Sequence, residues 1–325
     1  MIIDTHSHVF APDYLELFAR PQHSTVATRS GRDWHITYGD ALKFVLSEDA
    51  YHPAGKLERM DRLGIDVAVL STNIPGPELL PPELSAEGAR RINDHIADVM
   101  GRYPGRFAGL ASLPWASPPE ALSELERAMD ELGHSGAVLY SHVSGRQVDD
   151  PLFEPIYEAL AQRGAPLVFH PTVPAWGEAI KDYSMITMLG LQVDTSFALL
   201  RLILSGVLER HPSLKVVMPH AGGILPYMIG RIDHQTETLG RGREHISRPP
   251  SSYLREVYLD SVTPSAQTLR FAYEFAGQHR LLFGTDDPWV DSELLLQALE
   301  ALELPDAERE AVLSGNARAL FALGG

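Results

Sequence analysis

Four residues of the types that bind metal ions each follow an apolar segment of the sequence. His6 and His8 lie two positions apart after the apolar start of the chain, so in an extended strand their imidazoles leave the same face. His170 ends the run Pro-Leu-Val-Phe-His, and Asp286 ends Leu-Leu-Phe-Gly-Thr-Asp. A single histidine in such a place is more often a hydrogen-bonded polar residue than a ligand, but the same placement at separate strand ends indicates one site. Three neutral imidazoles and one carboxylate suit a single Zn(II) ion, or a Mn(II) ion as the second choice, with a position left for water or a substrate oxygen.

His220 ends a further apolar segment, Leu-Lys-Val-Val-Met-Pro-His. An imidazole with an ordinary pKa near 6.5 transfers protons at neutral pH. We therefore expect His220 to be the general acid or base, with a fifth ligand or a structural histidine as the alternative. Asp286 would share the catalytic role, because a metal-bound carboxylate lies beside any water on the same metal. One metal is expected rather than two, because the segment Ala137–His142 holds no lysine whose carbamate would bridge a second ion.

Four other residues are candidates for contacts with a substrate. Arg231 stands eleven residues after His220, and a guanidinium suits bidentate binding of a carboxylate; a surface ion pair with a nearby acid is an equal alternative. Trp176 and Trp289 lie in loops after expected strands, where they would wall an aromatic pocket or pack in the core. His142 ends a strand and would hydrogen-bond the substrate or support another residue.

Short apolar strands alternate with amphipathic helices, which is the pattern of a parallel sheet with helical crossovers. The first of eight expected strands opens the chain, and the others cover approximately 65–71, 107–113, 136–140, 166–170, 214–220, 256–261 and 281–285. The count of eight, without a Gly-x-Gly-x-x-Gly motif after the first strand, favours a closed (β/α)8 TIM barrel over an open α/β sheet. The carboxyl ends of all barrel strands meet at one rim, so the candidate residues would meet there.

We expect one barrel domain over residues 1–325. The segment 10–51 is polar and reads as irregular, and it is too long for an ordinary strand-to-helix loop. It is therefore expected to be an inserted cap over the mouth of the barrel, where loops set specificity. Two or three extra helices are expected to finish the chain from Ser292.

The overall composition excludes several classes of protein. The chain has 27 basic and 43 acidic residues and a net charge of −16, which argues against nucleic acid and anionic membranes as partners. It has no cysteine, so it has no disulfide, no thiolate nucleophile and no cysteine-based zinc site. No signal-peptide pattern and no apolar run of membrane length is apparent. A cytoplasmic protein is expected.

Several short motifs together resemble the amidohydrolase superfamily, in the branch of the aminocarboxymuconate-semialdehyde, γ-resorcylate and 5-carboxyvanillate decarboxylases. They are His6-Ser7-His8, Phe169-His170-Pro171, Pro219-His220-Ala221-Gly222-Gly223, Gly230-Arg231-Ile232, Gly284-Thr285-Asp286 and Gly315-Asn316-Ala317. The resemblance implies a (β/α)8 barrel with one divalent metal, usually zinc or manganese. It implies His6, His8, His170 and Asp286 as ligands and His220 as the catalytic histidine. It also implies a homodimer in which the arginine matching Arg231 reaches a substrate carboxylate across the subunit contact.

Two positions depart from the pattern of this branch. The muconate-semialdehyde enzymes carry a second arginine in the inserted segment, where Lys43 is the nearest cation here, so their exact substrate is not implied. Asp287 stands where an aromatic residue is usual and would make that part of the pocket more polar.

The expected function is metal-dependent decarboxylation of an aromatic or unsaturated carboxylic acid, without an oxidant. The same site would alternatively hydrolyse a lactone, ester or amide, because related members hydrolyse lactones or hydrate double bonds. A metal-stabilised binding protein without catalysis is the third alternative, and it predicts that replacing His220 changes no activity.

Overall fold

Eight parallel strands form the centre of the protein, whose computed structural model describes residues 1–19 and 25–324. They make two parallel sheets, in the orders β1-β5-β6 and β13-β12-β11-β10-β7. Isolated parallel bridges join the sheets at both seams, between Ser7 and Asp287 and between Ala111 and Ala137. The two sheets together have the arrangement of the predicted barrel, with a single bridge in place of a continuous ladder at each seam. The eight strands are β1 (Ile3–Val9), β5 (Val67–Thr72), β6 (Phe107–Gly109), β7 (Ala137–Tyr140), β10 (Leu167–His170), β11 (Val216–Met218), β12 (Tyr258–Asp260) and β13 (Leu281–Leu282).

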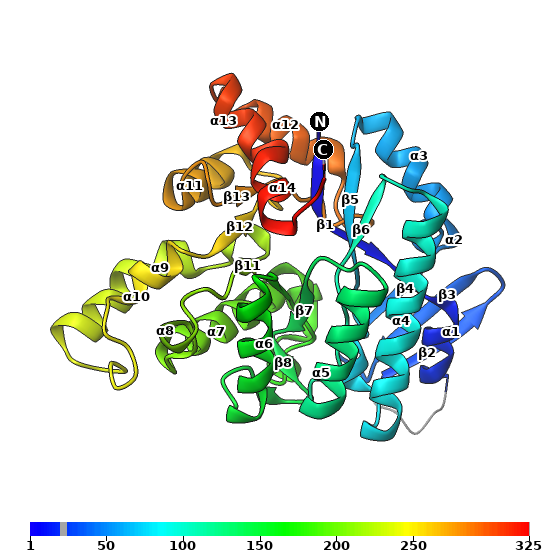
Figure 1. Ribbon diagram of the computed structural model, residues 1–325, viewed down its shortest axis with the longest axis horizontal. Helices are drawn as coiled ribbons and strands as arrows, with labels where there is room; N and C mark the ends of the chain where they lie inside the picture. Colours follow the sequence, from blue (N-terminus) through cyan, green and yellow to red (C-terminus); the bar gives the residue numbers. More distant parts are fainter. Residues whose placement is uncertain (20–24, 325) are drawn as a thin grey trace.

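Helices follow the parallel strands and cover the outside of the barrel (Figure 1). The helix α3 shows the local reasons: Pro53 begins it, the His52 ring accepts a hydrogen bond from the Ala54 amide, and Gly64 ends it in the left-handed conformation. The helices are α1 (Pro12–Leu15), α2 (Glu48–Tyr51), α3 (Pro53–Leu63), α4 (Pro82–Arg102), α5 (Pro118–Glu126), α6 (Glu154–Arg163), α7 (Leu191–Leu204), α8 (Val207–Arg210), α9 (Leu225–Asp233), α10 (Pro250–Leu254), α11 (Ala266–Ala276), α12 (Ser292–Glu300), α13 (Asp306–Glu310) and α14 (Asn316–Phe321).

The helix α14 closes the amino-terminal end of the barrel. Its residues Leu320 and Phe321 pack in one buried cluster with Ile3, Val69 and Leu282, which point inward from three barrel strands. The side-chain amide of Asn316 donates to the carbonyls of Gln278 and Leu281 and so holds α14 against β13. The predicted C-terminal helices therefore include one that plugs the end opposite the expected site.

The inserted segment is more regular than we expected. Within it, β2 (Thr25–Ser30), β3 (Asp33–Tyr38) and β4 (Leu42–Leu46) form an antiparallel sheet, which lies beside α1 and α4 in Figure 1. The alternation along β3, where Trp34, Ile36 and Tyr38 are buried and His35 is exposed, is a strand signal that the polar composition obscured. Residues 20–24 of the expected cap lie outside the described part of the chain. A short hairpin of β8 (His142–Val143) and β9 (Arg146–Gln147) follows β7.

One helical segment of the described residues, Asp182–Leu204, is long and apolar enough by composition to cross a membrane, although no such run was expected. It includes α7, whose Asp194 is buried and accepts hydrogen bonds from the Ser141 hydroxyl and the Trp176 indole. Leu199 and Leu202 of α7 belong to the main hydrophobic core. The segment is therefore a core helix of the layer around the barrel.

Candidate metal centre

The barrel brings together the four residues that were predicted to bind a metal. His6 and His8 belong to β1, His170 ends β10, and Asp286 follows β13. Their ligand atoms all lie within 4.8 Å of one another, and all four residues are buried. Because β1 extends to Val9, the two histidines stand inside the strand and not at its end, but their spacing still directs both rings to the same face.

The three histidines each fix one ring nitrogen and direct the other to the centre of the cluster. His6 Nδ1 lies 2.7 Å from Asp260 Oδ2, and His170 Nδ1 donates to the Pro171 carbonyl at 2.7 Å. His8 Nδ1 lies 3.1 Å from the Ser71 hydroxyl. Such second partners set the tautomer and orientation of metal-binding histidines.

The donor set fits a divalent cation. His6 Nε2 is buried and has no hydrogen-bond partner among the described residues, although it lies 3.4 Å from Asp286 Oδ1. His8 Nε2 lies 3.0 Å from the same carboxylate oxygen. An orphaned imidazole nitrogen beside a carboxylate is expensive to bury unless a cation lies between them. The arrangement therefore provides one divalent metal site with nitrogen and oxygen ligands.

The charges at the site favour a carboxylate anion beside imidazoles. Burial raises the pKa of Asp286, but the charge of His6 and hydrogen bonds from His220 and His8 outweigh it and hold the pKa well below its ordinary value. Burial lowers the pKa of His8 to about 4 and that of His170 well below its usual range. Burial also opposes protonation of His6, but the nearby carboxylates Asp286 and Asp260 raise its pKa to about 9. The carboxylates around His6 thus favour a positive charge at this position, which a metal cation would supply.

His220 lies beside this cluster on a strained turn. Its Nε2 is 3.5 Å from Asp286 Oδ2, and its ring centre is 5.4 Å from that of His6. His220, Ala221 and Asp286 all have positive φ angles between 54° and 57°, which non-glycine residues seldom adopt outside functional sites. At Gly223 an added Cβ would lie 2.4 Å from the Ser196 hydroxyl, so the close approach of this turn to α7 requires glycine.

A cavity of about 590 Å³ opens over the cluster. Trp289 lines it as predicted, and its ring meets Phe44 of β4 edge-to-face at 5.1 Å, so the inserted sheet supplies part of an aromatic wall. The lining residues are Ala41, Leu42, Lys43, Phe44, Asn73, Ile74, His170, Pro171, Lys181, Ser184, Ile186, Thr187, Leu191, Gln192, His220, Val262, Pro264, Asp286, Trp289 and Val290. The sequence reading missed Lys181, Gln192 and Asn73. It also missed Asp260, although an acid at the end of a barrel strand satisfies the rule that found Asp286.

Three predicted substrate contacts lie away from this cavity. Trp176 donates to Asp194 at 2.9 Å and faces Phe197, so it packs on α7. Both ring nitrogens of His142 bond to the backbone, at Val173 O and Gly145 N; its role is therefore to hold loops together. Arg231 is exposed on α9 and does not appear among the described residues that line the cavity.

Asp287 does not add polarity to the cavity, contrary to expectation. Its carboxylate instead pairs with Lys56 and Arg59 of α3, and it is not among the described residues that line the cavity.

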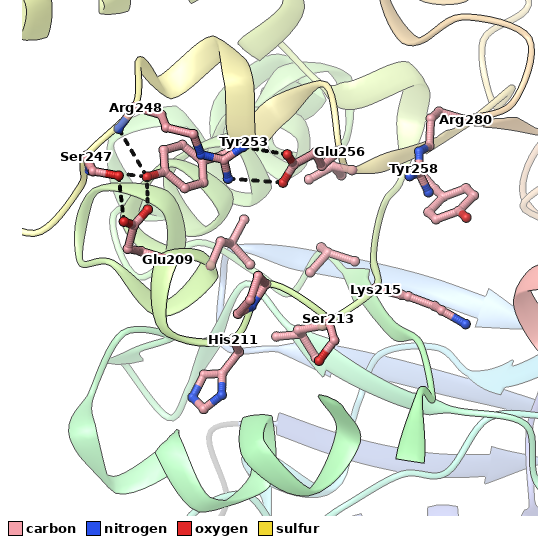
Figure 2. Close-up of a pocket in the computed structure, with 15 residues that line it drawn as sticks. Glu209, His211, Ser213, Lys215, Ser247, Arg248, Tyr253, Glu256, Tyr258 and Arg280 are labelled. Carbon is pink, nitrogen blue, oxygen red and sulfur yellow. Dashed lines mark hydrogen bonds and ion pairs between the residues drawn. The ribbon is translucent and has the colours of Figure 1, made fainter. Parts of the chain in front are cut away.

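A second hollow of about 530 Å³ lies near the starts of β11 and β12, at the other end of the barrel. Figure 2 shows that some of its polar side chains are bonded to one another: Arg248 pairs with Glu256, and the Ser247 hydroxyl donates to Glu209 at 2.6 Å. None of the predicted site residues lines this hollow, whereas His170, His220, Asp286 and Trp289 line the first cavity.

Comparison with known proteins identifies the family of this chain. The family described as amidohydrolase matches residues 3–323. A 2-amino-3-carboxymuconate-6-semialdehyde decarboxylase of Dictyostelium discoideum is 30% identical over an alignment of 285 positions, and this alignment covers 84% of this chain and 77% of that protein. The structure of 5-carboxyvanillate decarboxylase from Sphingomonas paucimobilis is 29% identical, has a TM-score of 0.86 and covers 99% of both chains. A dihydroxybenzoic acid decarboxylase from Polaromonas sp., solved with manganese and 2-nitroresorcinol, is 27% identical, has a TM-score of 0.83 and covers 99% of this chain and 97% of its own.

Proposed function

The chain belongs to the amidohydrolase family, and on that premise we propose that it is a metal-dependent, non-oxidative decarboxylase, a carboxy-lyase acting on aromatic carboxylic acids. The observation that carries the proposal is the placement of four ligand residues at the base of an aromatic-walled cavity with His220 beside them. The matched relatives and structures named above are decarboxylases of carboxylated aromatic or unsaturated compounds.

His6, His8, His170 and Asp286 are the residues that we assign to the metal, with zinc as the first candidate and manganese as the second. Three imidazoles and one carboxylate suit both ions, and the related decarboxylase from Polaromonas was solved with manganese. When bound, the cation supplies Lewis acidity and orients the carboxylate or an adjacent hydroxyl of the acid.

His220 and Asp286 are the residues that we assign to proton transfer. Decarboxylation breaks the bond between the carboxyl carbon and its neighbour, releases CO2 and leaves an electron pair on carbon that one proton must neutralise. His220 stands on the rim of the cavity with Nε2 3.5 Å from Asp286 Oδ2, so a proton can be held between the two groups. We assign delivery of that proton to His220.

The cavity favours a flat acid. The rings of Phe44 and Trp289 line it, which suits an aromatic or conjugated substrate. Lys43 and Lys181 line the same cavity and would attract an anion into the mouth of a protein that carries a net charge of −16.

Release of CO2 separates decarboxylation from hydrolysis. The purified protein, loaded in turn with zinc and manganese, is incubated with hydroxybenzoates, muconate-type acids and lactones, and CO2 and acid release are measured in parallel. We expect CO2 from at least one acid and none from the His220→Asn variant, while the metal content of that variant stays at the wild-type level. Hydrolysis of a lactone, ester or amide without CO2 from any acid would support the alternative function and refute this one.

We propose that the protein is a homodimer and that the exposed face of α9 forms the contact between its two subunits. Tyr227 on this helix is 82% exposed, one turn before Arg231, and a second copy that covers it would place Arg231 near a neighbouring cavity. Mixing Arg231→Ala subunits with His220→Asn subunits tests this, because a dimer that shares Arg231 across the contact gains one intact site. Recovery of activity on mixing is expected, and its absence contradicts shared sites.

The protein is soluble, and the lack of cysteine supports a cytoplasmic location.

A further inference from the structure

Two buried charged residues, Lys56 and Asp287, and the partly exposed Arg59 form a group beside the proposed metal ligand Asp286. Asp287 is 7% exposed and Lys56 is 2% exposed, and the Lys56 ammonium pairs with the Asp287 carboxylate. Arg59 contacts the same carboxylate through two nitrogens, with Nε at 2.7 Å from Oδ1 and Nη2 at 2.9 Å from Oδ2. We call Lys56, Arg59 and Asp287 the charged clamp.

The charged clamp joins α3 to the two chain segments that carry metal ligands. The Lys56 ammonium also donates to the Ser7 hydroxyl at 2.7 Å, and Ser7 stands between His6 and His8. On the other segment, the Asp287 carbonyl accepts the His8 amide at 2.9 Å. Lys56 is therefore bonded to the immediate neighbours of three ligands, His6, His8 and Asp286, although it touches none of them.

The backbone between these contacts has little freedom. The Asp286 amide donates to the His6 carbonyl at 2.7 Å, and Asp286 itself has a φ of 57°. Such a conformation persists only where the surroundings determine it. The Asp287 side chain, held by two cations one residue further on, is the strongest polar anchor on the far side of Asp286.

The energetics support a role beyond stability. Replacing a buried ion pair by apolar residues is often neutral or stabilising, so a pair of this kind is weak evidence for stability by itself. Burial raises the pKa of Asp287, but Lys56 and Arg59 outweigh it and lower the pKa to about 2, so the carboxylate stays charged at all ordinary pH values. Arg59 also donates to the Asp49 carbonyl at 3.0 Å and so ties the inserted segment to the same point.

We propose that the charged clamp is a positioning device for the metal ligand Asp286, acting through the fixed backbone of Asp286 and Asp287. The inference rests on the metal assignment of the proposed function and not on the identity of the substrate. Loss of the Asp287 charge releases the segment, lets Asp286 leave its orientation towards His6 and His8, and weakens metal binding.

The test compares Asp287→Asn and Lys56→Met with the double variant Lys56→Met/Asp287→Asn, which removes both buried charges together. Metal affinity is measured by competition with a chromogenic chelator, and the visible spectrum of the cobalt-loaded protein reports the ligand geometry. The Tm of the metal-free protein reports stability. We expect about tenfold weaker metal binding in each variant and a changed cobalt spectrum, including in the double variant. The Tm of the double variant recovers because neither fully buried charge is left alone, while the partly exposed Arg59 reaches solvent.

Glu124→Gln is the matched control. Glu124 is also a buried carboxylate, 3% exposed at its side chain, and it bonds to Arg127 and Asn93, which are not among the metal ligands. This variant is expected to lower Tm and to leave metal affinity and the cobalt spectrum unchanged.

Wild-type metal affinity and an unchanged cobalt spectrum in the double variant would overturn the proposal. If Asp287→Asn does not fold, Arg59→Gln replaces it, because the Arg59 side chain is partly exposed; unchanged metal affinity there equally overturns the proposal. Both readouts need no substrate, so failure to find CO2 release would count against the proposed function alone.

Discussion

Asp260 offers the sharpest test of how the metal site is held. Its Oδ2 lies 2.7 Å from His6 Nδ1, while its Oδ1 accepts the backbone amides of Ala221 at 3.2 Å and Val262 at 3.0 Å. In Asp260→Asn the amide oxygen can serve either the two backbone amides or His6, but not both. If the oxygen stays with the two amides, the new NH2 group faces His6 Nδ1–H, and two donors oppose each other.

The imidazole of His6 then relieves the conflict by changing tautomer. Its proton moves to Nε2, which is the nitrogen that faces the other ligands, and the lone pair needed by a metal is lost. Removal of such a second partner costs about 10- to 100-fold in metal affinity, or about 1.4–2.8 kcal/mol. If the oxygen instead turns to His6, the Ala221 amide loses its acceptor, and the turn that carries His220 loosens.

Competition with a chromogenic chelator measures the effect on the purified protein. Asp194→Asn is the control, because Asp194 is also a buried acid but bonds to Ser141 and Trp176 and not to an imidazole. We expect the control to bind metal as the wild type does. A metal affinity of Asp260→Asn within twofold of the wild type would refute the tautomer argument.

Three further outcomes are expected. Removal of the metal by a chelator should lower Tm, and restored zinc or manganese should raise it, because a ligand that binds only the folded state stabilises it; a Tm that does not respond contradicts the metal site. Trp289→Ala should raise KM for aromatic acids more than it lowers kcat, because Trp289 lines the cavity away from the proton-transfer residues, and steady-state kinetics check this against the reverse pattern. Burial raises the pKa of Glu78 from 4.5 to about 8, so its contribution to stability is complete below pH 4.5 and is lost as pH rises towards 8. In urea unfolding, the free energy of unfolding of Glu78→Gln should therefore rise relative to that of the wild type by about 1.4 kcal/mol per pH unit in that window. An unfolding free energy that depends on pH in the same way in both proteins would contradict the raised pKa.

The metal ligands could be predicted because the barrel imposes a simple rule on the sequence. A polar residue after an apolar strand lies at the carboxyl rim, so His6, His8, His170 and Asp286 converge whatever lies between them. The same rule cannot separate a metal ligand from a residue that supports a ligand. His142 satisfies the rule, but its ring bonds only to backbone atoms. Asp260 also satisfies the rule and supports His6, but it was not predicted from the sequence.

Contacts between distant surfaces could not be predicted. Lys56 on α3 looks like an ordinary solvent-facing lysine in the sequence, and its partner Asp287 is 231 residues away. The position of the inserted sheet was likewise inaccessible, because the pairing of β2, β3 and β4 does not specify where the sheet rests. Only the packing of Phe44 against Trp289 shows that it reaches the cavity.

The packing of α14 against the end of the barrel bears on how reaction products leave the site. Leu320 and Phe321 fill the amino-terminal end of the barrel in the described part of the chain, which blocks that route from the metal site. We therefore expect carbon dioxide and the aromatic product to leave through the cavity that admits the acid, whose lining includes Phe44 of the inserted sheet and Lys181. The width of the cavity opening then controls how carbon dioxide passes the larger aromatic product on its way out.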